Sequence, residues 1–312
     1  MSGTALLGGY AADLALGDPR RWHPVAGFGR AALQVERLVY APTRHRGALF
    51  AVALVALATL SAELAARAAR RAGVRPGLVL AAATWTALGG RSLVSEARRI
   101  AALLDRGDLA GARAGLPALV GRDTSALDEE QVCRAVVESV AENTSDAVVG
   151  ALLWGAVAGP AGVAAYRSAN TLDAMVGHRS QRYEAFGWAA ARLDDLMSWP
   201  GARGGAALAV LAAPLVGGSP RAAWGAIRRD GPTHPSPNAG RMEAAFAGAL
   251  GVGLGGPLSY GGRVELRPAL GDGPPPRPED VRRAARLSLA VGACAAAGCA
   301  LLRGARRRRV PA

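Results

Sequence analysis

Uncharged, mostly apolar runs alternate along the chain with shorter polar segments. The runs are rich in Ala, Leu, Val and Gly and are broken by Gly and Pro, and β-branched residues almost nowhere alternate with polar ones as they do in strands. This pattern predicts helices throughout. The uncharged runs are Gly47–Ala62, Pro76–Gly90, Ala147–Tyr166, Gly204–Pro220 and Leu287–Leu302, with a weaker sixth at Met1–Ala12.

The lengths of these runs bear on membrane insertion. A spanning helix needs about 20 predominantly apolar residues, with a range of about 17–25, so Ala147–Tyr166 meets the length and the others are marginal. Buried helices of a soluble protein are the alternative, since Ala-rich runs also fill cores and Glu63 flanks one of them. The recurrence of such runs, and the basic residues from Arg303 to Arg309 that would suit an anionic bilayer, favour the membrane.

We therefore expect an all-α, multi-pass helical integral membrane protein whose connectors carry the chemical motifs. Residues 1–312 are expected to form a single membrane domain. A Pro-rich stretch over residues 271–278 predicts a stiff linker before the last helix. A short extended piece is expected within Gly262–Pro268.

The connectors constrain the topology. If all five longer runs crossed the membrane, the polar connectors could not share one face, and one site could not use all of them. We therefore expect one run to be re-entrant or buried in protein. The two candidates are Ala147–Tyr166, which Gly159 and Pro160 interrupt, and Gly204–Pro220, which Pro214 interrupts.

Charge and composition exclude several function classes. The formal net charge of +13 comes from Arg, since the chain contains no Lys, and no stacking aromatics are interleaved with the arginines, which argues against nucleic acid. Without Lys there is no Walker A site, and the G-x-G-x-x-G match at residues 251–256 follows an expected helix instead of a strand. Cys133, Cys294 and Cys299 form no CxxC pair, so reduced, buried thiols are expected.

One acidic segment runs directly into an apolar run. Arg134, Glu138, Glu142 and Asp146 recur every four residues and so share about a third of a helix circumference. A solvated helix face with Arg–Glu pairs is one interpretation. The other is a ligand site, because a charge that borders the apolar run starting at Ala147 needs a partner or a ligand.

Two segments place polar side chains before an expected helix. Arg122-Asp123-Thr124-Ser125 precedes a helix expected over Asp128–Val140, which a capping box from Ser125 to Asp128 would open, and Ser236-Pro237-Asn238-Ala239-Gly240 precedes one over Met242–Leu250. Guanidinium, hydroxyl and helix start together suit phosphate. Each could equally be a cap with an incidental Arg. Ser92 and Asp108 are expected to cap shorter helices.

The segment Ala169–Trp199 is the densest in chemically active side chains. Adjacent Asp194 and Asp195 project about 100° apart on a helix, so one can serve a site while the other forms a structural ion pair. Histidines can accept a proton at neutral pH or act as structural hydrogen bonders. The remaining candidates in or near this segment are Asn170, Asp173, His178 and Arg182, and the N-terminal region adds His23.

These segments and several others occur in one order along the chain, from about residue 8 to about residue 262. They are Gly17-Asp18-Pro19, His23-Pro24-Val25, Gly29-Arg30, Ser92-Leu93 with Glu96, Val120–Ser125, Arg134–Asp146, Ala169–Trp199, Ser236–Gly240, Leu254–Pro257 and Tyr260–Gly262. In this order they resemble the membrane-bound adenosylcobinamide-phosphate synthases of vitamin B12 biosynthesis, the CobD/CbiB family. The chain departs from the family pattern at Ser198-Trp199-Pro200, where the family usually has Asn before the Trp, and in a compressed spacing before His23.

The resemblance implies a carbon–nitrogen ligase of the cell inner (cytoplasmic) membrane. It would use ATP to join aminopropanol phosphate, or a related compound such as ethanolamine phosphate, to a propionate of adenosylcobyric acid, giving adenosylcobinamide phosphate. A non-catalytic corrinoid carrier, or a scaffold for other nucleotide-loop enzymes, is the alternative. With the resemblance, we expect Mg²⁺ ligands at Glu138, Glu142, Asn143 and Asp146, catalytic roles for His23, Asp173, Asp194 and Asp195, and substrate or nucleotide binding by Arg122, Asp123, Thr124, Asn170, Arg182, Ser236 and Asn238.

Overall fold

The computed structural model describes residues 3–19, 23–121, 123–178, 180–260 and 263–308. The chain divides into two compact units. Unit 1 comprises Met1–Gly89, Asp146–Pro200 and Ala295–Ala312, and unit 2 comprises Gly90–Ser145 and Gly201–Cys294. Two compact units can belong to one domain, so the single domain expected over residues 1–312 stays a prediction.

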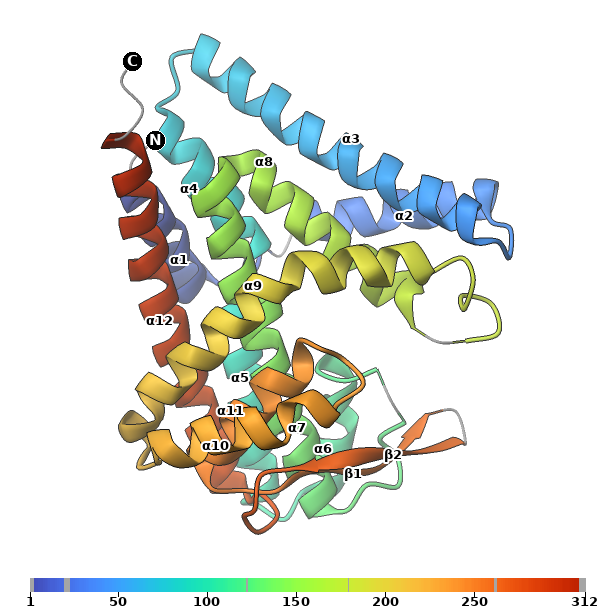
Figure 1. Ribbon diagram of the computed structural model, residues 1–312, viewed down its shortest axis with the longest axis vertical. Coiled ribbons are helices and arrows are strands. Elements are labelled where there is room, and N and C mark those ends of the chain that lie inside the picture. Colours follow the sequence, from blue (N-terminus) through green and yellow to red (C-terminus); the bar gives the residue numbers. More distant parts are fainter. Residues whose placement is uncertain (1–2, 20–22, 122, 179, 261–262, 309–312) are drawn as a thin grey trace. The chain divides into compact units, whose positions relative to one another are not determined.

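Helices dominate both units, as the sequence predicts (Figure 1). Unit 1 contains α1 (Thr4–Leu16), α2 (Pro24–Val39), α3 (Arg44–Arg71), α4 (Pro76–Ala87), α8 (Gly150–Leu172) and the π-helical turn Asp173–Gly177. It also contains the first half of α9 (Trp188–Ala212), as far as Pro200. Unit 2 contains α5 (Gly90–Leu104), α6 (Leu109–Gly115), α7 (Glu129–Thr144), α10 (Pro220–Arg229), α11 (Ala239–Leu250), β1 (Leu254–Tyr260), β2 (Arg263–Leu270) and the start of α12 (Pro278–Arg308).

Helix starts follow local capping chemistry. Asp108 accepts a hydrogen bond from the Gly111 N–H and caps α6, as expected. The capping box of α7 is formed by Asp128 and Gln131, so the box expected from Ser125 to Asp128 was wrong by three residues, because Asp123 holds Ser125 in the preceding loop. Ser92 lies inside α5, which begins at Gly90, so the expectation that Ser92 caps this helix was wrong.

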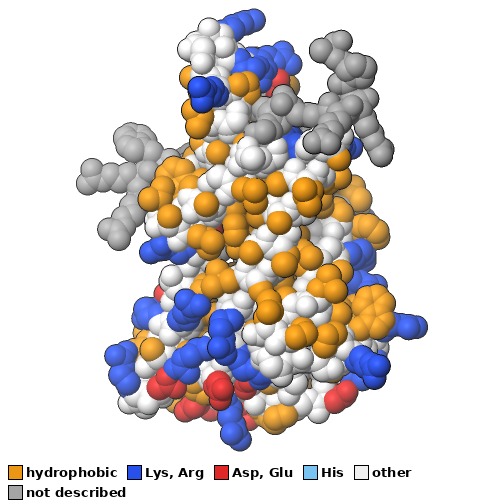
Figure 2. Space-filling model, turned by 90° about the vertical axis from the view of Figure 1, so that its left-hand side faces the viewer, with side chains coloured by type: hydrophobic (Ala, Val, Ile, Leu, Met, Phe, Trp, Pro, Cys, Tyr) orange, Lys and Arg blue, Asp and Glu red, His pale blue; other side chains and the backbone are white. Residues whose placement is uncertain are grey.

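Four helical segments of the described chain are long and apolar enough to cross a membrane: Arg44–Arg71, Pro76–Leu104, Glu129–Gly177 and Pro278–Arg306. Each contains one of the predicted uncharged runs. Only 17% of the apolar window in Arg44–Arg71 is buried, and large apolar side chains such as Leu49, Leu57 and Leu64 are more than half exposed. Figure 2 shows apolar side chains spread over the displayed surface. Such exposure is typical of lipid-facing helices.

The remaining long run, Gly204–Pro220, is not among these segments. Helix α9 ends at Ala212, and a short 3₁₀ turn over Ala213–Val216 contains Pro214. The interruption at Pro214 that the sequence indicates therefore ends the helix.

Helix α8 is broken at Gly159, whose φ of 67° and ψ of −149° are not helical. Pro160 follows and has no N–H to donate to the carbonyl of Ala156. Arg303 of α12 donates instead to the carbonyls of Gly155 and Ala156, both at 2.8 Å. Figure 1 shows α8 change direction, and 67% of the apolar window in this segment is buried. The predicted interruption at Gly159 and Pro160 is confirmed, and that this run is re-entrant or buried in protein stays a prediction.

Close packing in unit 1 depends on small residues. Helices α1, α2, α3, α4 and α8 contact one another. Phe186 packs its ring against Phe50 and Tyr40 at centroid distances of 5.1 and 5.2 Å. A Cβ at Gly47 would collide with the carbonyl of Phe186. Small residues at such contacts allow backbones to approach closely, as is common in membrane bundles.

A β-hairpin interrupts the helices of unit 2. Strands β1 and β2 pair antiparallel with a register shift between Leu254 and Gly256, where Gly255 and Gly256 have φ values of 84° and 92°. A side chain at Gly255 would meet the carbonyl of Pro268. The extended piece expected within Gly262–Pro268 is therefore the second strand of a longer hairpin, which contacts α7 and α11.

Removing the Arg303 side chain tests how the break in α8 is stabilised. Arg303→Met keeps most of the aliphatic stem but removes the donors to two buried carbonyls, so unfolding should become easier by about 1.5–3 kcal/mol. Thermal unfolding of the full-length protein in detergent measures the change. Arg221→Met, at an exposed position of α10, is the control. Equal melting temperatures for both variants would mean that water or lipid replaces the Arg303 contacts.

Candidate functional site

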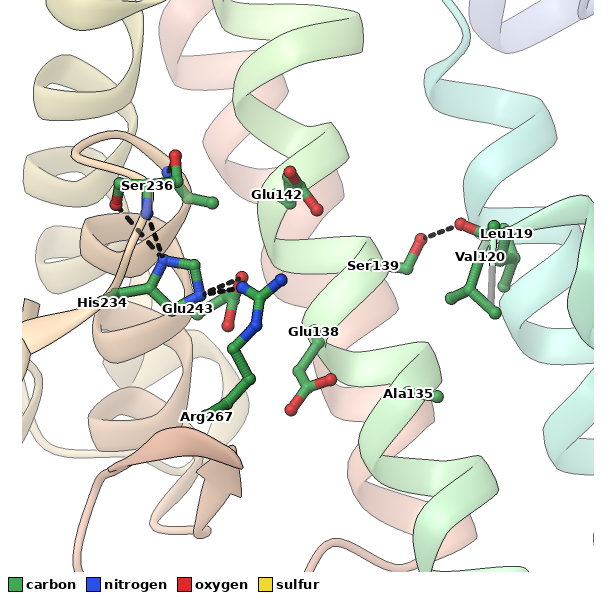
Figure 3. Close-up of a pocket in the computed structure, with 12 residues that line it drawn as sticks. Leu119, Val120, Ala135, Glu138, Ser139, Glu142, His234, Ser236, Glu243 and Arg267 are labelled. Atoms are coloured by element: carbon green, nitrogen blue, oxygen red, sulfur yellow. Dashed lines mark hydrogen bonds and ion pairs between the residues drawn. The ribbon is translucent and has the colours of Figure 1, made fainter. Parts of the chain in front are cut away.

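A polar cavity of about 270 Å³ lies within unit 2 (Figure 3). Helix α7 forms one wall, and the segment before α11, α11 itself and β2 supply residues opposite. The polar side chains in its lining are Glu138, Ser139, Glu142, His234, Ser236, Glu243 and Arg267. Two residues predicted as metal ligands and one predicted to bind substrate therefore meet in one cavity.

His234 makes the most defined contacts in the cavity. Its side chain is 2% exposed, and its Nε2 lies 2.7 Å from a terminal nitrogen of Arg267. A guanidinium only donates hydrogen bonds, so Nε2 accepts this one. On the other side of the ring, Nδ1 lies 3.1 Å from the backbone nitrogen of Ser236 and 3.2 Å from its carbonyl oxygen. His234 thus links the backbone of one loop to a side chain of β2.

The cavity carries more negative than positive charge. Glu138 accepts a hydrogen bond of 2.9 Å from the Gly255 N–H, which ties α7 to the hairpin. Glu142 is exposed, and Glu243 lies 3.8 Å from Nε2 of His234. Three carboxylates face one guanidinium in the lining, so two formal negative charges remain when His234 is neutral. Such a cavity attracts cations.

The other two predicted metal ligands, Asn143 and Asp146, are not among the residues that line the cavity. The Asn143 amide nitrogen donates to the carbonyl and hydroxyl of Ser139. Asp146 belongs to unit 1, in the π-helical turn Ser145–Val149. In the part of the chain that the structure describes, no group of three or more His, Cys, Asp and Glu side chains is arranged to hold a metal.

The residues predicted to bind phosphate have local roles. The Ser236 hydroxyl accepts from the N–H groups of Asn238 and Ala239 at the start of α11, and Asn238 accepts from Arg203. Burial, together with nearby Arg241, lowers the pKa of Arg203.

The segment before α7 is organised in the same local way. Asp123 accepts from the backbone and hydroxyl of Ser125, which lowers the Asp123 pKa, and Thr124 donates to the carbonyl of Arg113. Arg122 lies outside the described residues.

A second polar cluster lies within unit 1 around Asp194, which is 8% exposed. Asn170 donates to its carboxylate at 3.3 Å, Ser198 donates at 3.4 Å, and Arg167 donates to Asn170 at 2.9 Å. Burial raises the Asp194 pKa to about 6 against the effect of these hydrogen bonds, and the charge of Asp195 adds to the rise. The structure therefore joins two predicted site residues, and Ser198, the departure from the family pattern, contacts both Asp194 and Tyr166.

The adjacent carboxylates differ, as the sequence analysis expected of neighbours on a helix. Asp195 forms a long ion pair with Arg192 at 3.6 Å. Burial raises its pKa, while Arg192 opposes the rise. Asp194 is thus the more deeply placed of the two.

Three other predicted site residues of unit 1 lie elsewhere. His23 caps α2, with its Nδ1 accepting from the Val25 N–H. Arg182 donates to the buried carboxylate of Glu36 at 2.9 Å and stacks over the Tyr40 ring at 4.1 Å. Asp173 is half-buried at the start of a π-helical turn.

Sequence analysis missed three residues of the unit 2 cavity. Glu243 could have been noticed as a lone acid within an apolar helix, which normally signals a partner or a site. His234 stands two residues before the Ser236 motif, but the sequence alone does not distinguish it from a histidine with a structural role. Arg267 carries no local signal, because only the pairing of β1 with β2 brings it to the cavity.

The raised pKa of Asp194 predicts a pH-dependent stability. The protonated carboxyl is favoured in the folded state, so its ionisation destabilises the protein as pH rises from about 4 to about 6, on the order of 3 kcal/mol. Asp194→Asn mimics the protonated form and should be more stable than the wild type above pH 6, with the difference vanishing near pH 4. Melting temperatures at both pH values measure this, and exposed Asp272→Asn is the control. A pH-independent difference would contradict the assignment.

Comparisons with known proteins agree on one family. The family model described as "CobD/Cbib protein" matches residues 6–288. Proteins named "Cobalamin biosynthesis protein CobD" are similar over most of their length: one from Mycobacterium tuberculosis (strain ATCC 25618 / H37Rv) is 51% identical over 288 residues, 92% of this chain and 91% of the relative. One from Chromobacterium violaceum is 46% identical, covering 88% of each chain. One from Rhodobacter capsulatus is 42% identical, covering 94% and 93%.

No solved structure matches this chain. The family match nevertheless spans nearly all of both compact units, including the cavity lining and the Asp194 cluster. The chain therefore belongs to the CobD/CbiB family of cobalamin biosynthesis proteins.

Proposed function

We propose that this protein is an adenosylcobinamide-phosphate synthase of the cytoplasmic membrane. It joins aminopropanol phosphate, or a related amino-alcohol phosphate such as ethanolamine phosphate, to a propionate of adenosylcobyric acid. A carboxylate is a poor electrophile at neutral pH, so ATP is the co-substrate that activates it. The observation that carries the proposal is the unit 2 cavity of a CobD/CbiB protein, in which two carboxylates of the motif helix α7 face an arginine and a histidine.

The donor set of this cavity fits magnesium that is already held by phosphate. Mg²⁺ at nucleotide sites commonly takes one or two protein carboxylates and completes its shell with phosphate oxygens and water. Glu138 and Glu142 would hold it, and its two positive charges match the two formal negative charges of the lining. When bound, the ion would supply charge stabilisation for the transferred phosphoryl group.

The residues of unit 1 have a separate proposed role. The amine nucleophile is protonated at neutral pH and must lose a proton before it attacks. Asp194, with its pKa raised to about 6, is suited to accept a proton near neutral pH. Asp173 is proposed to bind the ammonium group, and Asn170 orients the Asp194 carboxylate. His23 is less suited to act as a base, because its Nδ1 caps α2.

Turnover by the purified full-length protein tests the function. Adenosylcobyric acid, ethanolamine phosphate or aminopropanol phosphate, and Mg²⁺-ATP are supplied together in detergent, and the amide product is detected by mass spectrometry. ATP consumption should require both co-substrates. A non-catalytic corrinoid carrier or an assembly scaffold would instead bind the corrinoid without consuming ATP.

Glu142→Gln tests the proposed metal ligand. The substitution keeps the side-chain volume and removes the anionic oxygen, so turnover should fall by about 100-fold or more while membrane insertion persists. Glu130→Gln, at an exposed position in the first turn of the same helix, is the matched control. Near-normal turnover of Glu142→Gln at saturating Mg²⁺ would assign Glu142 to a structural pair.

A further inference from the structure

The arginine of the unit 2 cavity has no role in the proposed function so far. Arg267 supplies the positive charge of a lining that otherwise contains carboxylates, a histidine and hydroxyls. We propose that Arg267 binds a phosphate group in this cavity and that His234 is the residue that positions it. The inference rests on the proposed function, because ATP and the amino-alcohol phosphate are the phosphate-bearing substrates of that reaction.

The hairpin places Arg267 at the cavity. Its two strands are held in register by the shift at Gly255 and Gly256, and the Gly255 N–H is anchored on Glu138 of α7 at 2.9 Å. The same carboxylate lines the cavity. A change in the hairpin would therefore move Arg267 relative to α7.

His234 sets the orientation of the guanidinium. A guanidinium presents five N–H donors in a rigid plane, so a single bond to a fixed acceptor limits the directions of the whole fork. The acceptor here is Nε2 of His234 at 2.7 Å, and the ring is fixed in turn through the contacts of Nδ1 with the backbone N–H and carbonyl of Ser236. Figure 3 shows the guanidinium of Arg267 between Glu243 and Glu138. His234 is thus a positioning residue.

Size and charge indicate a phosphate group at this position. A cavity of about 270 Å³ lies below the roughly 300–1,000 Å³ of pockets that enclose drug-sized ligands, so it suits a phosphate end more than a whole nucleotide or corrinoid. Magnesium on Glu138 and Glu142 would bring the formal charge of the lining to zero. An anionic phosphate then meets no net repulsion, and a guanidinium is a strong directional partner for it.

Four variants separate binding from positioning. Arg267→Gln removes the charge and Arg267→Lys keeps it without the fork. His234→Gln retains a side-chain oxygen that can accept from Arg267, and His234→Leu does not. Arg221→Gln on α10 and His45→Gln on α3, both at exposed positions, are the matched controls. Calorimetric titration of each full-length protein in detergent uses ATP, ethanolamine phosphate and inorganic phosphate, with Mg²⁺ and with EDTA.

With Mg²⁺ present, Arg267→Gln should weaken the binding of one phosphate ligand by about 10–150-fold, and His234→Leu should weaken the same ligand. His234→Gln should restore most of the affinity, which a merely structural histidine would not explain. If ATP is the affected ligand, Arg267 binds a nucleotide phosphate. If ethanolamine phosphate is affected instead, it binds the phosphate of the amine substrate.

The outcomes also separate this inference from the proposed function. If Arg267→Gln binds all three ligands as the wild type does while the wild type forms product, the inference is overturned and the proposed function stands. The opposite result is that the wild type forms no amide product, while Arg267→Gln binds phosphate more weakly than the wild type does. In that case the inference stands and the proposed reaction is wrong. If Arg267→Lys unfolds at the same temperature as the wild type, the hairpin remains folded when Arg267 is replaced.

Discussion

Backbone hydrogen bonding in apolar surroundings is the constraint on which unit 1 depends. A carbonyl without a donor is costly where water is absent, yet α8 is interrupted at Gly159 and Pro160. The arginines at the end of the chain resolve this conflict, because Arg303 donates to two of the carbonyls near the break and Arg306 to a third. A basic segment that suits a bilayer surface therefore also stabilises a broken helix more than a hundred residues earlier.

In unit 2 the main constraint is different, because several charged side chains lie together in a largely helical fold. Three carboxylates and one guanidinium line a single cavity, and Glu138 and Arg267 each have a defined hydrogen-bond partner. Glu138 binds a backbone N–H of the hairpin, and His234 connects Arg267 to the backbone of Ser236. These contacts hold Glu138 and Arg267 in place, which would reduce the reorganisation that the proposed reaction requires.

Several polar residues predicted at a site make structural contacts. His23 caps a helix, Arg182 neutralises the buried Glu36, and Asp123 holds a turn. In each case the side chain is of a type that also does chemistry, so the predicted site role stays a prediction beside the observed contact. The pair Asp194 and Asn170 shows the opposite outcome, because residues 24 positions apart meet in one buried cluster.

The sequence by itself determined the helical class, the uncharged apolar runs, the interruption near Gly159 and the motifs that identify the family, because periodicity, apolar length and Gly–Pro chemistry are local properties. The structure placed four of those runs in helical segments long enough to cross a membrane. The sequence also named Glu138, Glu142 and Ser236, which meet in the cavity. Only the tertiary structure added His234, Glu243 and Arg267, and only it separated Asp194 from Asp195 by burial. Those outcomes depend on strand pairing and helix packing between distant residues, which no local pattern encodes.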